Sequence, residues 1–195
     1  YYLTAENYLT ASRSPHLEVF RKKGLEVLLL TDRVDEWMIS HLSEFKGKTF
    51  EDITKGDLAL DETDKAEQEK AEKENESLIS RIKTTLGDKV EDVRISTRLT
   101  DSAACLVVGK DDMGMQMRRM LEAAGQALPE AKRVLEINTA HPLIVKMDMQ
   151  SDEARFADMA ELIFEQSQLA EGSQLQDPAG YVDRINKLLV GLLDG

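Results

Sequence analysis

Apolar and polar positions in residues 1–56 alternate between the spacing of strands and that of helices. A nearly continuous apolar run at 25–30 is typical of a buried parallel strand, because such a strand is covered on both faces. Ser14 precedes a proline and starts a helix that Gly24 ends. With a second helix at 32–45 and a further strand at 50–53, this order predicts a small α/β unit.

The pattern changes in residues 57–87, which we interpret as an acidic linker helix. The stretch 61–76 holds eight acids and three lysines, with almost no apolar residue except alanine. Such a composition is typical of a solvated helix supported by pairs of opposite charge four residues apart. Apolar positions return at helical spacing from Leu78 to Leu86, so we expect the second half to dock on the next domain and to end at Gly87.

Residues 88–195 combine strands with a helical end. Short apolar runs predict strands at 93–95, 103–108 and 132–138. Ser151 or Asp152 starts a helix to about Ala170, and Asp177-Pro178 starts a last helix that ends near 193. The fold class is therefore α/β of the mixed, α+β kind, with a helical hairpin at its end.

The two terminal helices are apolar on more than one side, so each needs two partners. A second copy of the chain can supply one of them, which gives an intermolecular four-helix bundle with two-fold symmetry. The hairpin can equally pack back on its own domain, and the pattern leaves both arrangements open. The residues assigned to a homodimer interface are Phe156, Ile163, Tyr181, Ile185, Leu188, Leu189 and Leu192.

Four of the eight methionines lie within eight residues, at 113, 115, 117 and 120. On a helix, Met113, Met117 and Met120 share one face with Leu121, whereas Met115 points the other way. A methionine stripe is either ordinary core or an adaptable binding surface.

Trp37 is the only tryptophan, and it lies at the edge of the apolar face of the helix at 32–45. Tryptophan at such an edge is commonly half-buried, but it also anchors binding surfaces.

Charge and residue chemistry exclude several classes of function. With 37 acids against 25 bases, the net charge of −12 argues against a nucleic-acid partner. No apolar run approaches the roughly 18 residues of a membrane span, so no membrane partner is expected. The single cysteine, Cys105, excludes a disulfide framework and indicates a reducing compartment. Because there is neither a signal peptide nor an initiator methionine, we expect a piece of a longer protein.

No arrangement of residues indicates catalysis or a resident cofactor. The chain lacks a glycine-rich phosphate loop, and its three histidines are scattered without the spacing of metal ligands. We therefore expect no metal site and no catalytic residues in these 195 positions.

Several motifs resemble those of the heat shock protein 90 chaperones. Residues 2–6, 14–18, 22–28 and 35–37 are similar to the end of that family's middle domain. Residues 98–102, 135–138 and 141–143 are similar to its C-terminal domain, in the same order. The short C-terminus, without a charged tail, resembles the family's bacterial form.

The resemblance implies a homodimeric, ATP-driven cytoplasmic chaperone of three parts here: the end of the middle domain (1–56), the linker helix (57–87) and a dimerisation domain (88–195). It also implies that ATP and Mg²⁺ belong to an N-terminal domain outside these residues, so that this chain is not itself an enzyme. Unfolded or partly folded client proteins would contact Glu36, Trp37, Ser40, Met113, Met117, Met120 and Leu121. Ser40 replaces a larger amide residue of the family, and Leu121 replaces an aromatic one.

Two other functions stay open. A small α/β enzyme could bind a phosphorylated ligand at the strand ends of residues 1–56, but the turn at 30–33 has no glycine. A pure dimerisation module would bury the methionine helix and bind no client.

Overall fold

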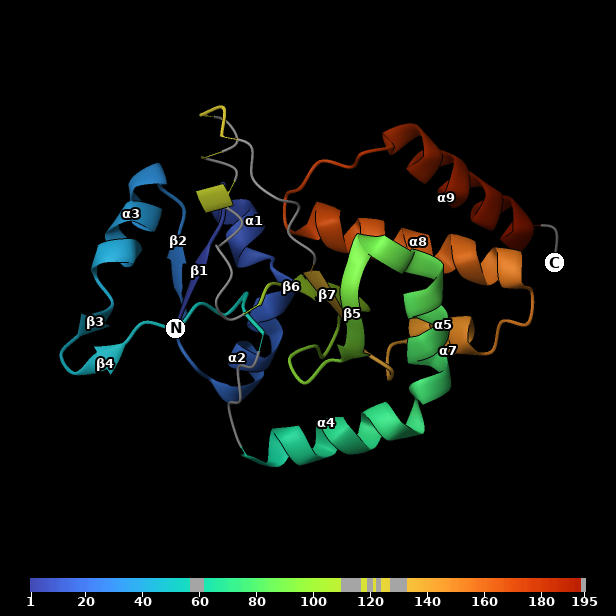
Figure 1. The fold of residues 1–195 in the computed structure, drawn as a ribbon, viewed down its shortest axis with the longest axis horizontal. Coiled ribbons are helices and arrows are strands. Elements are labelled where there is room, and N and C mark those ends of the chain that lie inside the picture. Colours follow the sequence, from blue (N-terminus) through green and yellow to red (C-terminus); the bar gives the residue numbers. More distant parts are fainter. Residues whose placement is uncertain (57–61, 110–116, 119–120, 122–123, 127–132, 194–195) are drawn as a thin grey trace.

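The computed structural model describes residues 1–56, 62–109, 117–118, 121, 124–126 and 133–193. The chain mixes helices and small sheets in two adjoining parts (Figure 1), which confirms the α+β class. We name residues 1–56 the N-lobe and residues 62–193 the C-lobe.

The N-lobe is built on two parallel strands, β1 (Tyr2–Thr4) and β2 (Leu28–Leu30). The chain between them forms α1 (Tyr8–Ser12), a 3-10 turn (Pro15–Leu17) and α2 (Glu18–Lys23). Both predicted ends of this helical segment are confirmed, because Ser14 Oγ accepts a bond from the His16 N–H and Gly24 adopts a φ of 67°. The lobe's core consists of Leu3, Ala11, Leu17, Val19, Phe20 and Ile53.

Three N-lobe elements differ from the sequence prediction. The strand predicted at 25–30 is shortened to β2 and is not buried: Leu28 is 53% exposed. The segment at 50–53 makes only an isolated bridge from Asp52 to Tyr2 beside β1, instead of a full strand. The second helix, α3 (Arg33–His41), ends before the predicted Phe45. A hairpin of β3 (Glu44–Phe45) and β4 (Lys48–Thr49) follows it, because Lys46 and Gly47 both adopt positive φ angles and reverse the chain.

The predicted linker helix is two helices, α4 (Glu62–Glu74) and α5 (Glu76–Leu86), which meet at Asn75. The Asn75 side chain donates to the Ala71 carbonyl at 2.8 Å, as asparagine does where it competes with regular helix. The second half docks as expected, with Leu78, Ile82 and Leu86 buried.

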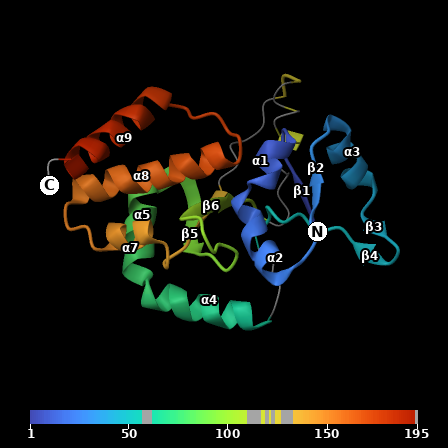
Figure 2. The same ribbon diagram turned by 180° about the vertical axis from the view of Figure 1, so that it is seen from behind.

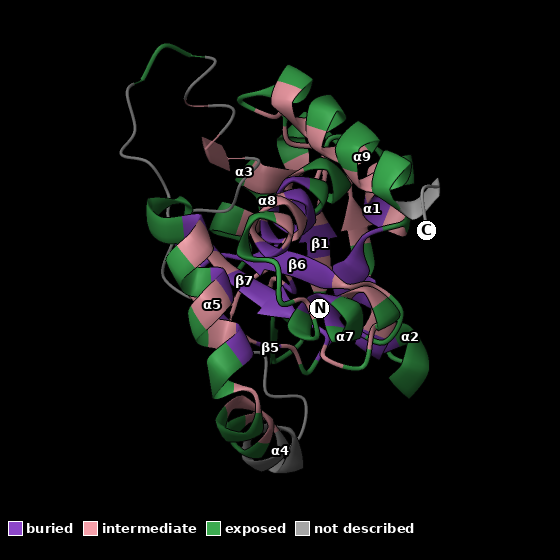
Figure 3. Cartoon of the chain, turned by 90° about the vertical axis from the view of Figure 1, so that its right-hand side faces the viewer, coloured by how far each residue is buried: buried purple, intermediate pink, exposed green. Residues whose placement is uncertain are grey.

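The C-lobe sheet has the order β5-β7-β6, from β5 (Val90–Ile95), β6 (Ala104–Val107) and β7 (Arg133–Ile137). The central strand β7 is parallel to β5 and antiparallel to β6. Helices α5 and α8 (Glu153–Ala170) pack on this sheet and on each other, and α7 (Pro142–Asp148) lies beside α8. Burial is concentrated in the strands at the centre (Figure 3), where β6 is buried throughout.

The last helix, α9 (Pro178–Leu193), folds back along α8 as a helical hairpin (Figure 2). The predicted start of α8 is confirmed, because the Asp152 side chain accepts bonds from the Ala154 and Arg155 N–H groups. Both helices end at the positions that the sequence predicts.

Candidate functional site

A row of large apolar side chains is exposed on α3 and the hairpin after it. Asp32 precedes the helix, and its N–H donates to the Asp35 carboxylate at 2.9 Å, which fixes the first turn. Within the described part of the chain, α3 contributes no buried residue. We name the exposed row the tryptophan surface; it consists of Val34, Trp37, Met38, Leu42 and Phe45.

Trp37 is 58% exposed, so it stands out from the helix instead of half-burying itself in a core. Its ring stacks on that of His41, one turn later, with 6.2 Å between centroids. Ser40 is also exposed, but its hydroxyl donates to the Trp37 carbonyl at 2.8 Å. The indole face away from His41 is thus the one that this helix can offer to a partner.

Glu36 connects α3 with the methionine stretch. Burial raises the pKa of its carboxyl, and the Asp52 carboxylate adds to that rise. The Thr4 hydroxyl and the Met117 backbone N–H lie close enough to favour the ionised form and oppose the shift. Because Met117 approaches Glu36, two of the predicted client segments, about 80 positions apart in sequence, adjoin in space.

Only part of the predicted methionine stripe belongs to the described residues. Met117 and Leu121 are helical and half-buried. Met113, Met115 and Met120 lie outside the described residues. The choice between a core stripe and a binding stripe stays a prediction for Met113 and Met120, and Met115 is expected to point away from the stripe.

The helix α9 carries two apolar faces, and they have different surroundings. Tyr181, Ile185 and Leu188 are half-buried on the side that faces α8. The solvent-facing side is exposed (Figure 3), and we name it the α9 outer face; it consists of Val182, Leu189 and Val190. The predicted interface set contains Leu189 of this face, while the Leu192 side chain lies outside the described residues.

Two ion pairs join the covered side of α9 to α8. Arg184 pairs with the buried Glu165, and Lys187 pairs with Asp158. On α8 itself, Phe156 and Ile163 are 0% and 3% exposed in the core of the C-lobe. These two members of the predicted interface set are therefore enclosed by the C-lobe. The exposed large apolar residues described on α9 are those of the α9 outer face.

The sequence model of the family described as Hsp90 protein matches residues 1–195. The chain belongs to the Hsp90 family. This is a family of ATPase chaperones and heat shock proteins, so chaperone function at that coarse level follows from membership.

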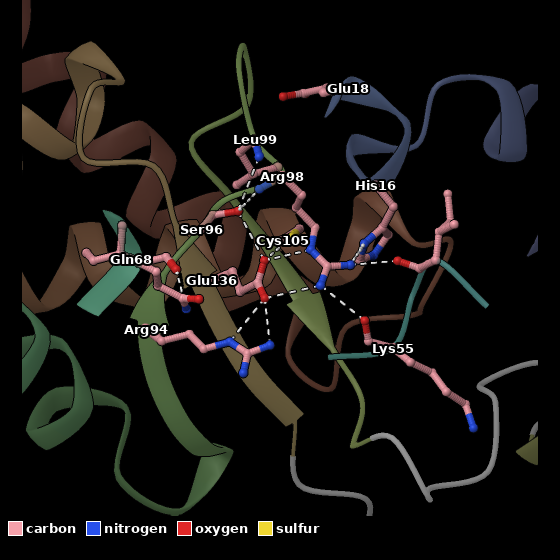
Figure 4. A network of polar contacts seen from close by, with 12 residues as sticks. His16, Glu18, Lys55, Gln68, Arg94, Ser96, Arg98, Leu99, Cys105 and Glu136 are labelled. Atoms are coloured by element: carbon pink, nitrogen blue, oxygen red, sulfur yellow. Dashed lines mark hydrogen bonds and ion pairs between the residues drawn. The ribbon is translucent and has the colours of Figure 1, made fainter. Parts of the chain in front are cut away.

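Motifs of this Hsp90 chain that are far apart in sequence meet at the junction of the lobes (Figure 4). Arg98 is 6% exposed, and its Nε lies 2.8 Å from Oε2 of the buried Glu136. The same guanidinium donates to the Ile53 carbonyl at 2.6 Å and to the Lys55 carbonyl at 3.1 Å. On the other side, Arg94 donates to Glu136 Oε1 at 2.8 Å. A buried ion pair thus joins the N-lobe backbone to strands β5 and β7.

Glu18 makes a second connection between the lobes. Its carboxylate accepts bonds from the N–H groups of Thr100, Asp101 and Ser102 and from the Ser102 hydroxyl. Burial alone would raise the pKa of Glu18, but these hydrogen bonds outweigh it and lower the pKa below its usual value. Sequence reasoning named these motifs as family-like and missed that they contact one another.

Other features of this Hsp90 chain bear on its chemistry. Cys105 is buried, and burial followed by the charge of Glu136 raises the pKa of its thiol. Among the described residues, no group of three or more His, Cys, Asp and Glu side chains is arranged to hold a metal ion. No helix in the described ranges is long and apolar enough to cross a membrane.

Proposed function

We propose that this chain binds unfolded or partly folded client proteins through the tryptophan surface and the adjoining methionine stretch, and that it forms a homodimer through α9. The exposure of Trp37, with the apolar face of its helix uncovered, carries the client assignment. Exposed apolar groups of this kind mark binding surfaces in soluble proteins.

The contact between Glu36 and Met117 supports a single client site made from both lobes. Aromatic side chains supply much of the energy of binding surfaces, and methionine adapts its shape to different partners. Glu36, Trp37, Ser40, Met117 and Leu121 therefore form the proposed site, with Met113 and Met120 as predicted members.

Client binding can be measured by fluorescence anisotropy with labelled, reduced and carboxymethylated lactalbumin as the unfolded protein. We expect Trp37→Ala to weaken binding by at least about tenfold, because loss of an aromatic anchor costs about 2 kcal/mol or more. Tyr8→Ala is the matched control, since Tyr8 is 68% exposed on α1 and does not belong to the tryptophan surface. Equal effects of the two substitutions would argue against the assignment. Unchanged client binding by the Trp37 variant, with dimerisation intact, would favour the pure dimerisation module.

The exposed apolar side chains of the α9 outer face support the dimer. Pairing the hairpins of two copies forms a four-helix bundle, in which about 1,500 Å² or more of buried surface makes a lasting interface. The expected result is a dimer in sedimentation velocity at micromolar concentration. Leu189→Glu combined with Val190→Glu should give monomers with unchanged helix content, whereas Gln174→Glu, in the exposed loop before α9, should not. A wild-type monomer at that concentration would rule out the bundle.

We also propose that ATP and Mg²⁺ are bound by other parts of the Hsp90 machinery and not by these residues. Nucleotide pockets enclose roughly 300 Å³ or more. The cavity between the lobes measures about 50 Å³, which is far too small for a nucleotide. The cytoplasmic location is likewise a proposal, and it rests on the family resemblance.

A further inference from the structure

His41 lies beside the tryptophan surface and adds a polar group to it. It is the last residue of α3 and is exposed, and its ring is 11° from parallel to the Trp37 indole. The side chains of the tryptophan surface offer a client apolar contact, and the indole N–H can only donate. An extended client segment also carries main-chain N–H groups, which need an acceptor when they leave water.

Two short contacts decide which ring nitrogen of His41 carries the proton. Nδ1 lies 2.9 Å from the Trp37 carbonyl oxygen, which can only accept. Nδ1 also lies 2.9 Å from Ser40 Oγ, whose hydrogen is directed to the same carbonyl. Nδ1 must therefore donate, so the neutral ring carries its proton there and keeps a lone pair on Nε2. Among the described residues, Nε2 has no hydrogen-bond partner.

The charged groups near His41 leave Nε2 available. On α3 itself, the Glu36 carboxylate is directed to the Thr4 hydroxyl and the Met117 N–H. The hairpin that follows carries Glu44, Lys46 and Lys48, and within the described part of the chain none of them forms an ion pair with the ring. The helix α3 lies at the outer edge of the N-lobe (Figure 1), where a long extended segment can reach it.

We infer that His41 is a specificity-determining residue of the client site: its Nε2 accepts a hydrogen bond from a main-chain N–H of an extended client segment whose apolar side chain covers the Trp37 indole. This role rests on the client site proposed above. An extended chain advances about 3.3 Å per residue, so the 6.2 Å between the two ring centroids corresponds to about two residues. The preferred client segment therefore has an apolar residue and, two positions away, a residue other than proline, which has no N–H.

The pH dependence of client binding tests this role, with labelled, reduced and carboxymethylated lactalbumin as the probe. Histidine gains its second proton between about pH 8 and pH 5, and this turns Nε2 from an acceptor into a donor. The wild-type dissociation constant should rise about three- to tenfold over that range, as expected for one lost hydrogen bond. Any titration of Glu36, whose pKa is raised, is shared by the variants and cancels in the comparison.

Two substitutions separate the acceptor from the ring. His41→Phe keeps a ring beside Trp37 but has no acceptor, so the histidine step in the pH profile should disappear. His41→Gln has a carbonyl oxygen that accepts at every pH. It should also lack the step, and at pH 8 it should bind the probe more tightly than His41→Phe does.

Nuclear magnetic resonance of the complete chain, labelled with ¹⁵N, gives a second readout. The free His41 ring should show the Nδ1–H tautomer, and saturating lactalbumin should shift the Nε2 resonance more than that of Nδ1. An Nε2–H tautomer, or the same pH profile for wild type and His41→Phe, would overturn this role and leave the client site standing. A wild type that binds no lactalbumin, or a Trp37→Ala variant that binds it equally well, would instead remove the client site and this role with it.

Discussion

Replacing Glu136 by glutamine removes one negative charge from between two arginines while keeping the size of the side chain. Glu136 is 3% exposed and faces Arg94 and Arg98, each with a nitrogen 2.8 Å from a carboxylate oxygen. Ser96 Oγ donates to Oε2 at 3.0 Å. A glutamine amide keeps one accepting oxygen but turns its NH₂ group toward these donors, which leaves Arg98 buried without its counter-charge.

The cost follows from the different burial of the two arginines. Removing one partner of a buried ion pair destabilises a protein by about 3–5 kcal/mol. The Arg94 side chain is 23% exposed and can hydrate, whereas that of Arg98 is 7% exposed and cannot. We therefore expect a loss of about 3–4 kcal/mol, a large part of the roughly 5–15 kcal/mol that holds a typical protein folded.

Urea unfolding followed by circular dichroism measures this loss. With a slope of about 2–3 kcal/mol/M, the midpoint should fall by about 1–2 M. Glu91→Gln is the control, because Glu91 lies exposed on β5 and its substitution should change stability by less than about 0.5 kcal/mol. A loss below 1 kcal/mol for Glu136→Gln, at an unchanged slope, would refute the assigned role of the buried charge.

The ion pair of Glu136 with the two arginines also makes the stability of the protein depend on pH. Burial would raise the pKa of Glu136, but Arg98 and then Arg94 lower it below the usual value of a glutamate. A lowered pKa contributes stability above the unfolded value of about 4.3 and loses it as pH falls through the folded value. The gap between wild type and Glu136→Gln should therefore stay constant from pH 6 to 8 and shrink below about pH 4.

Three further predictions concern other sites. Asp152→Ala removes the cap that accepts from two N–H groups at the start of α8, and it should cost about 1 kcal/mol in thermal or urea unfolding. Glu18→Gln should cost about 1–3 kcal/mol at pH 7. Since its pKa is lowered, that difference should stay constant at neutral pH and shrink as pH falls below about 4. Cys105 is 2% exposed and its thiol pKa is raised, so a disulfide reagent at pH 8 should label it only at the rate of unfolding; fast labelling in native buffer would contradict its burial.

Local chemistry made the helix ends predictable from the sequence. Ser14, Gly24 and Asp152 act through their own side chains or backbone angles, so neighbouring residues suffice to locate them. The hairpin after α3 was missed because residues 42–45 continue a helical pattern, and the positive φ of Lys46, a residue not specialised for it, gives no sequence signal.

Exposure was harder to predict, because it depends on which distant elements cover a face. Periodicity placed Trp37 at the edge of the apolar face of its helix. Whether another element covers that face depends on the tertiary structure, and among the described residues α3 has none that is buried. In the same way, α9 offered two apolar faces. The covered face is the one that also carries the pairs of Arg184 and Lys187 with α8, and the periodicity of α9 alone does not distinguish it. The contact of Glu18 with Thr100 spans 82 positions, and no local pattern encodes such a distance.

The order of strands in the C-lobe has a consequence for synthesis of the protein. Its central strand, β7, is the last of the three to leave the ribosome, yet β5 and β6 bond only to it within the sheet. A nascent chain that stops before Arg133 therefore exposes two strands with unpaired backbone groups, a state prone to aggregation. In such a chain Arg98 also lacks its counter-charge, the Glu136 carboxylate. We expect chains that end between β6 and β7 to aggregate more readily than the complete chain, because the central strand of their sheet is missing.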